Sequence, residues 1–564
     1  MTKRAPSATA LALPLLPPLV ALLVHASYVP RGFTWLDHGD VVVGRAVLPL
    51  ARLHEAFFMR MGDTGFFRPM AVVVHSLDRA LYGTWAPGFH LTSVVLHALV
   101  VAVVPFFLRA FVRLSSIEEC LAALVVAVHP LSWLAVGGIT YQQELLVTLF
   151  TLSAVALHAA ARRSGRPGAA ALAALSAGLA LLSKETAVFW IPALIALWEW
   201  LAFRTRDSSR QRIPWLWAAY AIVVALSLAA RAHAVPEVWR TAAAPLSTPE
   251  WIGVRLRAIV RSLAELLSPV PPSINDSAII GAPGLVESAV VLTVAACALL
   301  VLRRGVTSPA ARLVLVLAVT LAPALRLVPV SRFGSPHYTF PATAALGALA
   351  AVALRAARES GAAWRLAGGV LVGWLLVAAG LTAAGGARFT DDVALFTPEL
   401  ERDSGYPEAH AELGRHWLAA GDAAAARGHL EEALAPDADR IAYIDRSMVH
   451  VNLALALSAQ GRTTEAERQL AMAREVAPPS RRPVIDYNQA VLAARRDRDA
   501  EVVRLLAPHE GTWSTHEPSL LLARALGRLG RTAEAVRALE NAERTAPPDR
   551  RATIAAWRRS LAGR

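Results

Sequence analysis

The sequence predicts an all-α protein in two parts, a polytopic membrane domain followed by a soluble domain of helical repeats. Hydrophobic residues make up 55% of the 564-residue chain and charged residues only 18%, whereas soluble globular proteins carry about 25% charged residues. Before residue 385 the apolar residues form repeated runs of about 20, the length of a helix that crosses a bilayer. After that point a helical pattern recurs within the sequence.

Eleven apolar runs are candidate membrane spans. They lie at about 8–28, 88–110, 117–136, 141–161, 168–183, 186–203, 213–231, 285–302, 309–329, 337–356 and 364–383. The first run follows a short basic stretch, as a signal peptide does, but no small-residue cleavage site follows it, so we expect a retained anchor. Cys120 and Cys297 lie in or beside these runs, and their spacing indicates neither a disulfide framework nor a metal site. The membrane domain is expected over 1–385.

Arginines in the short connections predict the orientation of the spans. If the N-terminus is cytoplasmic, alternate connections should be basic. The connections on that side hold Arg109 and Arg113, segments 162–166 and 204–212, Arg303, Arg304 and Arg312, and Arg355, Arg358 and Arg365. The net charge of +13 is therefore interpreted as membrane-flanking arginine rather than as a nucleic-acid surface. This orientation places the loop 33–40 and, with eleven spans, the C-terminal part outside the cytoplasm.

Two segments outside the spans are predicted to lie on the membrane surface. Segment 251–267 places Arg257, Arg261 and Glu265 on one helical stripe, with apolar residues on the other faces, which is typical of an interfacial amphipathic helix. Segment 68–83 is a shorter candidate. The alternative for both is a helix packed against neighbouring spans.

The C-terminal part contains an internal repeat. Segment 450–478 aligns with 519–547 at an offset of 69 residues, about twice the 34-residue tetratricopeptide period. A further copy starts at Leu413, and 487–508 fits as a degenerate copy. We therefore predict a linker over 386–405 and a tetratricopeptide domain over 406–564. Such an array offers a surface for a peptide or protein partner.

Polar clusters interrupt or flank the spans on the predicted non-cytoplasmic side. They are FTWLDHGD (33–40), HPLSW (129–133), YQQE (141–144), LSKET (182–186) and SRFGSPHY (331–338). Charges at membrane depth are costly, so such residues are functional candidates. Alternatives remain for single residues. Glu144 could cap the span 141–161, Lys184 could pair with Glu185 or meet lipid head groups, and His97 could bond a neighbouring helix.

The first 200 residues carry a family resemblance. FTWLDHGDVV, FFRPMAVVVHSLDRALYGTWAPGFHLTSVVLHAL, HPLSWLAVGGITYQQELL and LSKETAVFWIPALIAL resemble the transmembrane-and-tetratricopeptide O-mannosyltransferases and their bacterial relatives in the GT-C superfamily. Segment 388–414 resembles the bridge of that family into its first repeat. Ser93, Ser132, Trp133 and Phe389 depart from its usual residues, and the central region has no motif that aligns.

The resemblance implies a membrane glycosyltransferase. It would move a mannose-like sugar from a polyprenyl-phosphate carrier to an acceptor, expected to be Ser or Thr of a protein that the repeats hold. Asp37 is the implied base, with Asp40 second and His38 orienting either one. Candidates for binding the substrate and its phosphate are Lys184, Arg332, Arg68, His90, His129, Glu144 and Glu185. A divalent metal is left open, with Asp37, His38 and Asp40 as its candidate ligands.

The composition indicates a bacterial source. The chain has two lysines, Lys3 and Lys184, and otherwise uses arginine, as proteins of GC-rich bacteria do. We expect a multi-pass protein of the bacterial inner membrane, with its active face and its repeats in the periplasm. The competing hypothesis is a non-catalytic membrane-anchored scaffold. A transporter is less favoured, because no matched pair of glycine-interrupted spans occurs.

Overall fold

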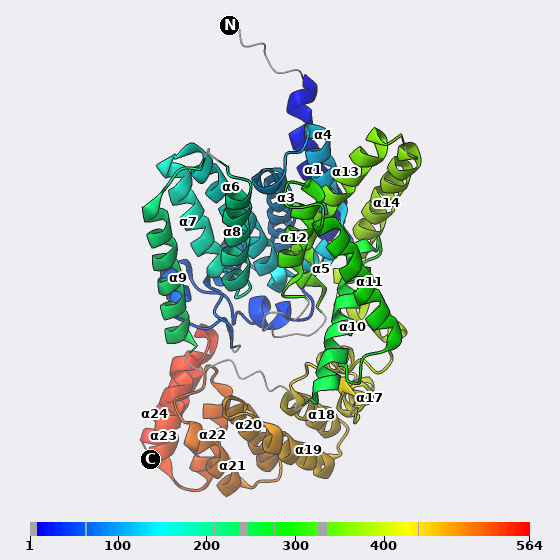
Figure 1. Cartoon of the computed structure of the whole chain (residues 1–564). Helices are drawn as coiled ribbons and strands as arrows, with labels where there is room; N and C mark the ends of the chain where they lie inside the picture. The colour runs from blue at the N-terminus through cyan, green and yellow to red at the C-terminus, as the bar shows by residue number, and fades with distance from the viewer. Residues whose placement is uncertain are drawn as a thin grey trace. The chain divides into compact units, whose positions relative to one another are not determined.

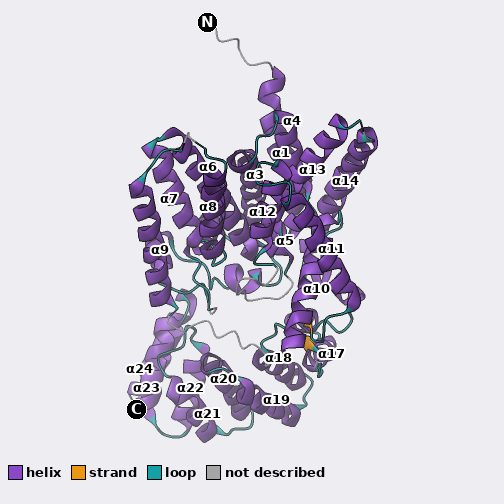
Figure 2. Ribbon diagram, in the orientation of Figure 1, coloured by secondary structure: helices purple, strands orange, loops and turns teal. Residues whose placement is uncertain are grey.

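Two compact units make up the chain, Met1–Glu399 with Ala438–Ala442, and Leu400–Asp437 with Tyr443–Arg564. The computed structural model describes residues 8–62, 65–207, 210–235, 246–275, 277–324, 335–361, 363–437 and 439–563. Both units are helical (Figure 1). Strands in these ranges are confined to the short antiparallel pair β1 (Ala278–Ile279) and β2 (Arg440–Ile441), which lies in the first unit (Figure 2).

Fourteen α-helices precede residue 386 in the described ranges. They are α1 (Ala8–His25), α2 (Pro69–Tyr82), α3 (Ala86–Phe111), α4 (Ser116–Val128), α5 (Trp133–Gly137), α6 (Gln142–Ser164), α7 (Pro167–Leu181), α8 (Ala187–Arg204), α9 (Pro214–Ala234), α10 (Thr248–Leu267), α11 (Leu285–Leu302), α12 (Pro309–Leu321), α13 (Thr343–Glu359) and α14 (Trp364–Gly385). The segment 386–405, expected as a linker, is largely helical, with the 3₁₀ helix η8 (Gly386–Phe389) and α15 (Asp392–Arg402).

The membrane-spanning helices agree with the sequence in position and only partly in number. Each of the eleven predicted spans overlaps a helix, although 117–136 is divided between α4 and α5 and the last part of 309–329 lies outside the described residues. Within the described residues, seven helices are long and apolar enough to cross a membrane, or eight if the bent pair α4–α5 forms one span. The apolar helices Leu13–Tyr28, Pro167–Leu181 and Pro309–Leu321 are shorter. The count of eleven therefore stays a prediction.

Helix α6 lies at the centre of the first unit. It packs against α3, α7 and α8, and most of its residues are buried. At the other extreme, α11 has no buried residue, and α9 and α14 have few. Apolar side chains that remain exposed on such helices suit contact with lipid rather than with water. The polar groups at the start of α6 are thus enclosed by protein.

Local sequence signals account for several helix ends. Ser115 and Glu118 form a capping box at the start of α4, and Ser247 and Glu250 form one at the start of α10. Pro130 follows α4, and the chain bends there by 49°, because proline cannot continue the hydrogen bonding of the preceding helix.

The two segments predicted to be interfacial fold as helices. The arginines of the polar stripe of α10 meet protein. Arg257 Nη2 donates to the carbonyls of Ile279 and Gly281, both at 2.9 Å, and Arg261 Nε lies 2.7 Å from Glu265. Helix α2 packs against α3 and α6, as the alternative expected. The position of either helix at a membrane surface stays a prediction.

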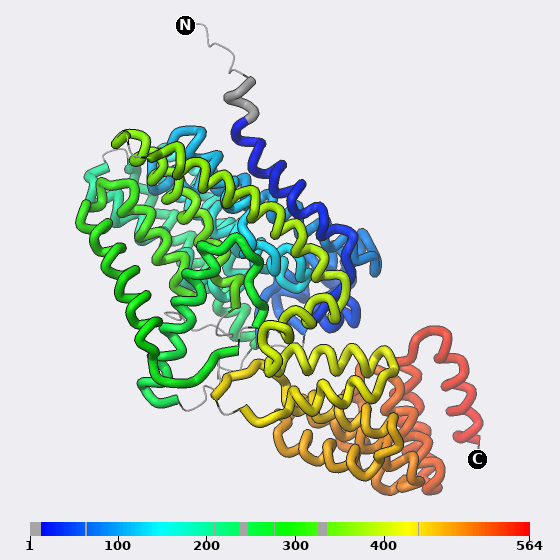
Figure 3. Tube along the Cα trace, turned by 90° about the vertical axis from the view of Figure 1, so that its right-hand side faces the viewer, coloured from blue at the N-terminus to red at the C-terminus, as the bar shows by residue number. Residues whose placement is uncertain are grey.

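The second unit is a succession of paired helices (Figure 3). They are α16 (Pro407–Ala419), α17 (Ala423–Leu434), α18 (Arg446–Ala459), α19 (Thr463–Val476), α20 (Arg482–Ala494), α21 (Asp499–Leu506), α22 (Glu517–Arg528), α23 (Thr532–Thr545) and α24 (Pro548–Ala562). The two aligned copies bury equivalent residues, Ala466 and Leu470 in one, Ala535 and Leu539 in the other.

The turns inside these pairs are also equivalent. Gly461 and Gly530 both end the first helix with φ near 74°, a left-handed conformation in which a Cβ would be strained. In the degenerate copy the equivalent turn is made by Asp497, at φ 53°. The paired-helix architecture agrees with the internal repeat, whereas its assignment as tetratricopeptide stays a prediction.

Candidate active site

Asp37 is a buried carboxylate held by two backbone amides. Its Oδ1 accepts the N–H of Thr140 at 2.8 Å, and its Oδ2 accepts the N–H of Thr34 at 3.2 Å. Burial raises the pKa of Asp37 to about 6, although the amide hydrogen bonds oppose the shift. The carboxylate keeps its charge above that pH and gains a proton readily below it. Both properties suit a general base.

Strained backbone precedes Asp37 by two residues. Trp35 has φ 53°, which is unfavourable for a residue with a bulky side chain. Its N–H donates to Asp392 Oδ1 at 2.7 Å, and its ring contacts Tyr141 and Phe396 with centroids 5.7 Å apart in each case. His38 Nε2 lies 3.2 Å from the same carboxylate. Asp392 therefore contacts the residues on both sides of Leu36 and Asp37, through the Trp35 backbone and the His38 side chain.

Sequence reasoning did not select Asp392. It lies in the segment expected to be a linker, 355 positions after Asp37, and only the pair Asp391–Asp392 marked it. The contacts with Trp35 and His38 show that α15 contributes to the site.

We expect Asp392→Asn to lower the turnover number at least tenfold without changing membrane insertion. The amide would weaken the acceptor for the Trp35 N–H and remove the charge beside His38. The measurement is kcat against KM for the glycosyl transfer proposed below. Asp391→Asn is the matched control, because Asp391 precedes α15 and its side chain accepts the N–H of Ala394 in the first turn of that helix. Equal losses in the two variants would show that Asp392 has no special role.

A network of buried charges lies at the same end of α6. Glu144 forms an ion pair with Lys184, and His337 Nε2 lies 3.6 Å from Glu144. Lys184 Nζ is also 4.5 Å above the ring of Tyr338. Glu144, Lys184 and His337 are almost fully buried. Desolvating these groups is costly, and buried charges in a membrane domain are candidates for a functional site.

Arg68 and Glu185 form a second buried pair. The Arg68 guanidinium donates to both Glu185 oxygens, at 2.5 and 2.9 Å, and stacks over Phe66 at 3.9 Å. Burial alone would raise the pKa of Glu185, but Arg68 and Lys184 outweigh it and hold that pKa below its usual value. The pairing of Lys184 with Glu185, one of the alternatives above, is therefore wrong, because Arg68 pairs with Glu185. Glu144 pairs with Lys184 and does not cap α6.

Tyr141 links the Asp37 loop to the buried charges. Its ring lies between those of Trp35, at 5.7 Å, and His337, at 5.2 Å. Thr140, whose amide holds Asp37, precedes Glu144 by about one helical turn. Six predicted residues thus lie together around the start of α6: Asp37, His38, Glu144, Lys184, Glu185 and Arg68. Four further residues lie with them that sequence reasoning did not name as site residues: Asp392, His337, Tyr338 and Tyr141.

The other predicted residues lie apart from this group or outside the described ranges. His90 Nε2 lies 2.9 Å from the Gly32 carbonyl and supports the loop. His129 Nε2 lies 3.0 Å from the Leu266 carbonyl and joins the bend after α4 to the end of α10. Asp40 is half-buried in the turn after His38. His97 Nε2 lies 3.5 Å from the Ala127 carbonyl of α4, which confirms the helix-contact alternative. Arg332 lies outside the described residues.

A further buried acid supports the start of α6. Asp78 of α2 accepts hydrogen bonds from Thr92 Oγ1 at 2.6 Å and Gln142 Nε2 at 3.2 Å. The same Gln142 amide donates to Ser93 Oγ and to the Phe89 carbonyl, both at 3.1 Å. Burial raises the pKa of Asp78 to about 6. This network fixes the position of Gln142, two residues beyond the Thr140 amide.

Metal-ligating side chains do not form clusters in the described residues. Nowhere in them do three or more His, Cys, Asp or Glu side chains gather in a way that could hold one. The carboxylate of Asp37 is engaged with backbone amides and His38 with Asp392.

Comparison with known proteins finds similarity to mannosyltransferases in part of the membrane domain. Residues 69–229 match the family model of dolichyl-phosphate-mannose-protein mannosyltransferases. A Caenorhabditis elegans protein O-mannosyl-transferase, F38B6.6, is 30% identical over 152 residues, and Drosophila melanogaster protein O-mannosyl-transferase Tmtc1 is 30% identical over 181 residues. The chain resembles the GT-C membrane mannosyltransferases.

The resemblance to GT-C mannosyltransferases covers a limited part of either chain. The two matches span 26% and 30% of this chain and 21% and 20% of the relatives, so only about a fifth of each relative is matched. Residues 424–564 match a different family model, the N-terminal domain of the type VII secretion protein EccA1. That match begins within the second unit at α17.

Two solved structures align with the chain at low similarity. ArnT from Cupriavidus metallidurans bound to undecaprenyl phosphate aligns at a TM-score of 0.40 and 15% identity, over 84% of this chain and 82% of ArnT. The apo structure aligns at 0.39 and 16%, over 87% and 81%. These scores are too low to support an inference about this chain.

Proposed function

We propose that the chain is a glycosyltransferase that moves a mannose-like sugar from a polyprenyl-phosphate carrier to a hydroxyl group of a protein acceptor, on the non-cytoplasmic face of the membrane. The observation that carries the proposal is the buried Asp37 carboxylate, held beside a network of buried cations at one end of the helices. The match of residues 69–229 to a mannosyltransferase family supports the same reaction class.

The reaction needs a base at one side of the sugar and cations at the other. Asp37 takes the proton of the acceptor Ser or Thr hydroxyl as its oxygen attacks the anomeric carbon. The bond from that carbon to the phosphate oxygen breaks, and the polyprenyl phosphate leaves with the electron pair. The acceptor becomes a glycoside, and the proton on Asp37 passes to solvent.

Lys184 and Arg68 are suited to receive the phosphate without leaving their partners. An ammonium has three N–H donors and a guanidinium has five, and the pairs with Glu144 and Glu185 occupy only some of them. As the donor diester becomes a monoester, its negative charge grows. Fixed cations stabilise that charge in the transition state more than in the ground state.

We expect kcat/KM for transfer to fall on the acid side with a midpoint near pH 6. Burial raises the pKa of Asp37 to about 6, so below that pH the base is protonated and cannot accept the hydroxyl proton. The measurement is the pH profile of kcat/KM with a lipid-linked sugar donor. A profile without an acid limb between pH 5 and 7 would contradict Asp37 as the base.

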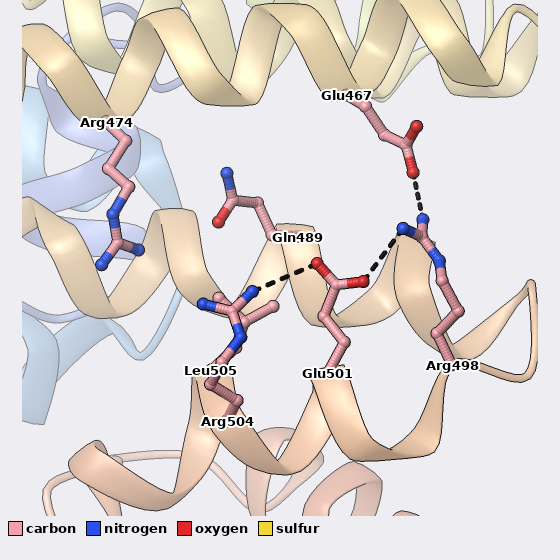
Figure 4. A pocket seen from close by; sticks show the side chains of 7 residues that line it. All are labelled: Glu467, Arg474, Gln489, Arg498, Glu501, Arg504 and Leu505. Atoms are coloured by element: carbon pink, nitrogen blue, oxygen red, sulfur yellow. Dashed lines mark hydrogen bonds and ion pairs between the residues drawn. The ribbon is translucent and has the colours of Figure 1, made fainter.

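The second unit is the proposed holder of the acceptor. Between α19, α20 and α21 it contains a cavity of about 420 Å³ lined by charged side chains (Figure 4). Arg498 bridges Glu467 and Glu501, and Arg504 also contacts Glu501. Lining of both charge signs, with Gln489 between, suits a polar peptide segment rather than an apolar one.

The test is a glycoproteomic comparison of the envelope fraction with and without the gene. We expect glycosylated Ser or Thr peptides to disappear in the deletion strain, to return with the wild-type gene and to stay absent with Asp37→Asn. A scaffold would predict full recovery with Asp37→Asn. The absence of any glycan change in the deletion strain would contradict the transferase proposal.

A further inference from the structure

An arginine-lined cavity lies at the far ends of the helices that build the candidate site. It encloses about 660 Å³ and is lined by Arg109, Arg113, Arg163, Arg312 and Asp207, among others. These residues come from the end of α3, the end of α6, the connection after α8 and the start of α12. The candidate site surrounds the opposite ends of α6 and α8.

Two of the arginines are held by hydrogen bonds to backbone carbonyl groups. Arg163 donates to the carbonyls of Arg109 and Ala110, at 3.1 and 2.9 Å. Arg312 donates to the carbonyls of Phe111 and Val306, at 3.0 and 2.6 Å. Both guanidinium groups therefore converge on the C-terminal end of α3. These contacts use two nitrogens of each group, so further N–H donors remain on each.

The cluster carries an excess of positive charge. Arg109 is paired with Glu119 through two hydrogen bonds of 2.6 Å, and Asp207 is the acidic residue of the cavity lining. Four arginines thus face two carboxylates. The partial negative charge at the C-terminal end of α3 offsets about half of one positive charge. Arg113 is exposed, and within the described residues it has no hydrogen bond or ion pair. The remaining charge suits one anion.

The depth of the cavity in the bilayer indicates which kind of anion it would bind. The span Ile139–Ser164 has 26 residues, which corresponds to about 39 Å of helix. A bilayer with its head groups is about 40–45 Å thick, so the two ends of this helix reach the two head-group layers. Arg163, near the end of the span, lies at head-group level. Basic pockets between helices at this level bind phospholipid head groups.

We propose that this cavity binds the phosphate group of an anionic phospholipid, at the membrane face opposite the candidate site. The head group would fill the cavity, and its phosphate would accept hydrogen bonds from Arg113 and from the free N–H groups of Arg163 and Arg312. This site is independent of the proposed glycosyl transfer.

The test uses the full-length protein purified in detergent and titrated with phosphatidylglycerol, with bound lipid counted by native mass spectrometry. We expect Arg113→Gln to weaken phosphatidylglycerol binding at least fivefold. Arg166→Gln is the matched control, because Arg166 is exposed in the connection after α6 and does not line the cavity. Equal binding by the two variants, or no preference of the wild type for phosphatidylglycerol over phosphatidylcholine, would overturn the proposal.

A second arm separates a lipid from a free phosphate. Inorganic phosphate is added at increasing concentration to the complex with phosphatidylglycerol. We expect displacement only at concentrations far above that of the lipid, because the phosphate alone does not fill the cavity. Displacement at equal concentrations would overturn the lipid as the occupant and leave a site for soluble phosphate. Glycosyl transfer by Arg113→Gln is measured alongside, so that a failed transferase proposal and a failed lipid site give different results.

Discussion

Asp37→Asn is expected to reduce glycosyl transfer by a factor of about 10² to 10⁴, the usual contribution of a general base. An amide cannot accept the hydroxyl proton, whereas it keeps the size of the carboxylate. Its oxygen can still accept one of the two amide hydrogen bonds, from Thr140 or from Thr34. The measurement is the initial rate with a lipid-linked sugar donor, together with the amount of protein in the membrane fraction.

Asp40→Asn is the control for this variant. Asp40 is in the same loop but is half-buried in the turn after His38, so its loss should change the rate far less. If Asp40→Asn removed activity and Asp37→Asn did not, the roles of the two acids would be reversed. If the Asp37→Asn protein does not insert into the membrane, Asp37→Glu is tested in its place. That variant keeps the charge and displaces the carboxylate by one methylene.

Lys184→Met is expected to destabilise the protein by about 3–5 kcal/mol, because it leaves the Glu144 carboxylate buried without its ion-pair partner. Activity should be lost together with the fold. The double variant Lys184→Met with Glu144→Gln removes both charges and should regain most of the stability. The measurement is the thermal unfolding midpoint of the purified protein in detergent, followed by the transfer assay.

The double variant separates a structural role from a chemical one. If Lys184 stabilises the leaving phosphate, the double variant should be folded and still reduced about 10²-fold in rate. Recovery of both stability and activity would show that the Lys184–Glu144 pair serves folding alone. The largely buried pair Arg162–Glu199, at the C-terminal ends of α6 and α8, offers the matched control. Its neutralisation as Arg162→Gln with Glu199→Gln should leave the transfer rate unchanged.

The membrane helices could be placed from the sequence because their signal is local. A run of about 20 apolar residues is itself the cause of a span, and all eleven predicted runs overlap helices. Helix ends such as the capping box of Ser115 and Glu118 are local too. The number of full-length spans could not be predicted from the sequence in the same way, because three of the apolar helices are short. Lipid contact or packing against neighbours determines whether a short helix crosses.

The candidate site could be located from the sequence only in part. The loop 33–40 and the clusters at 141–144 and 182–186 stood out as polar residues beside apolar runs, and the structure brings them together around the start of α6. His129 stood out for the same reason, yet it bonds the Leu266 carbonyl instead. A polar residue beside a span has the same local signal whether it serves a reaction or a helix contact.

The sequence by itself determined the class of protein and the positions of the helices, since both depend on residues close together in the chain. Asp37 was selected as the candidate base by the resemblance of its loop to a known family. Only the tertiary structure decided which groups the buried charged side chains pair with. Lys184 meets Glu144, 40 residues away, rather than the adjacent Glu185, and Glu185 meets Arg68, 117 residues away. Asp392 reaches Trp35 across 357 residues. A charge with several opposite charges within reach takes the partner that helix packing brings to hydrogen-bond distance, and a single sequence does not specify that packing.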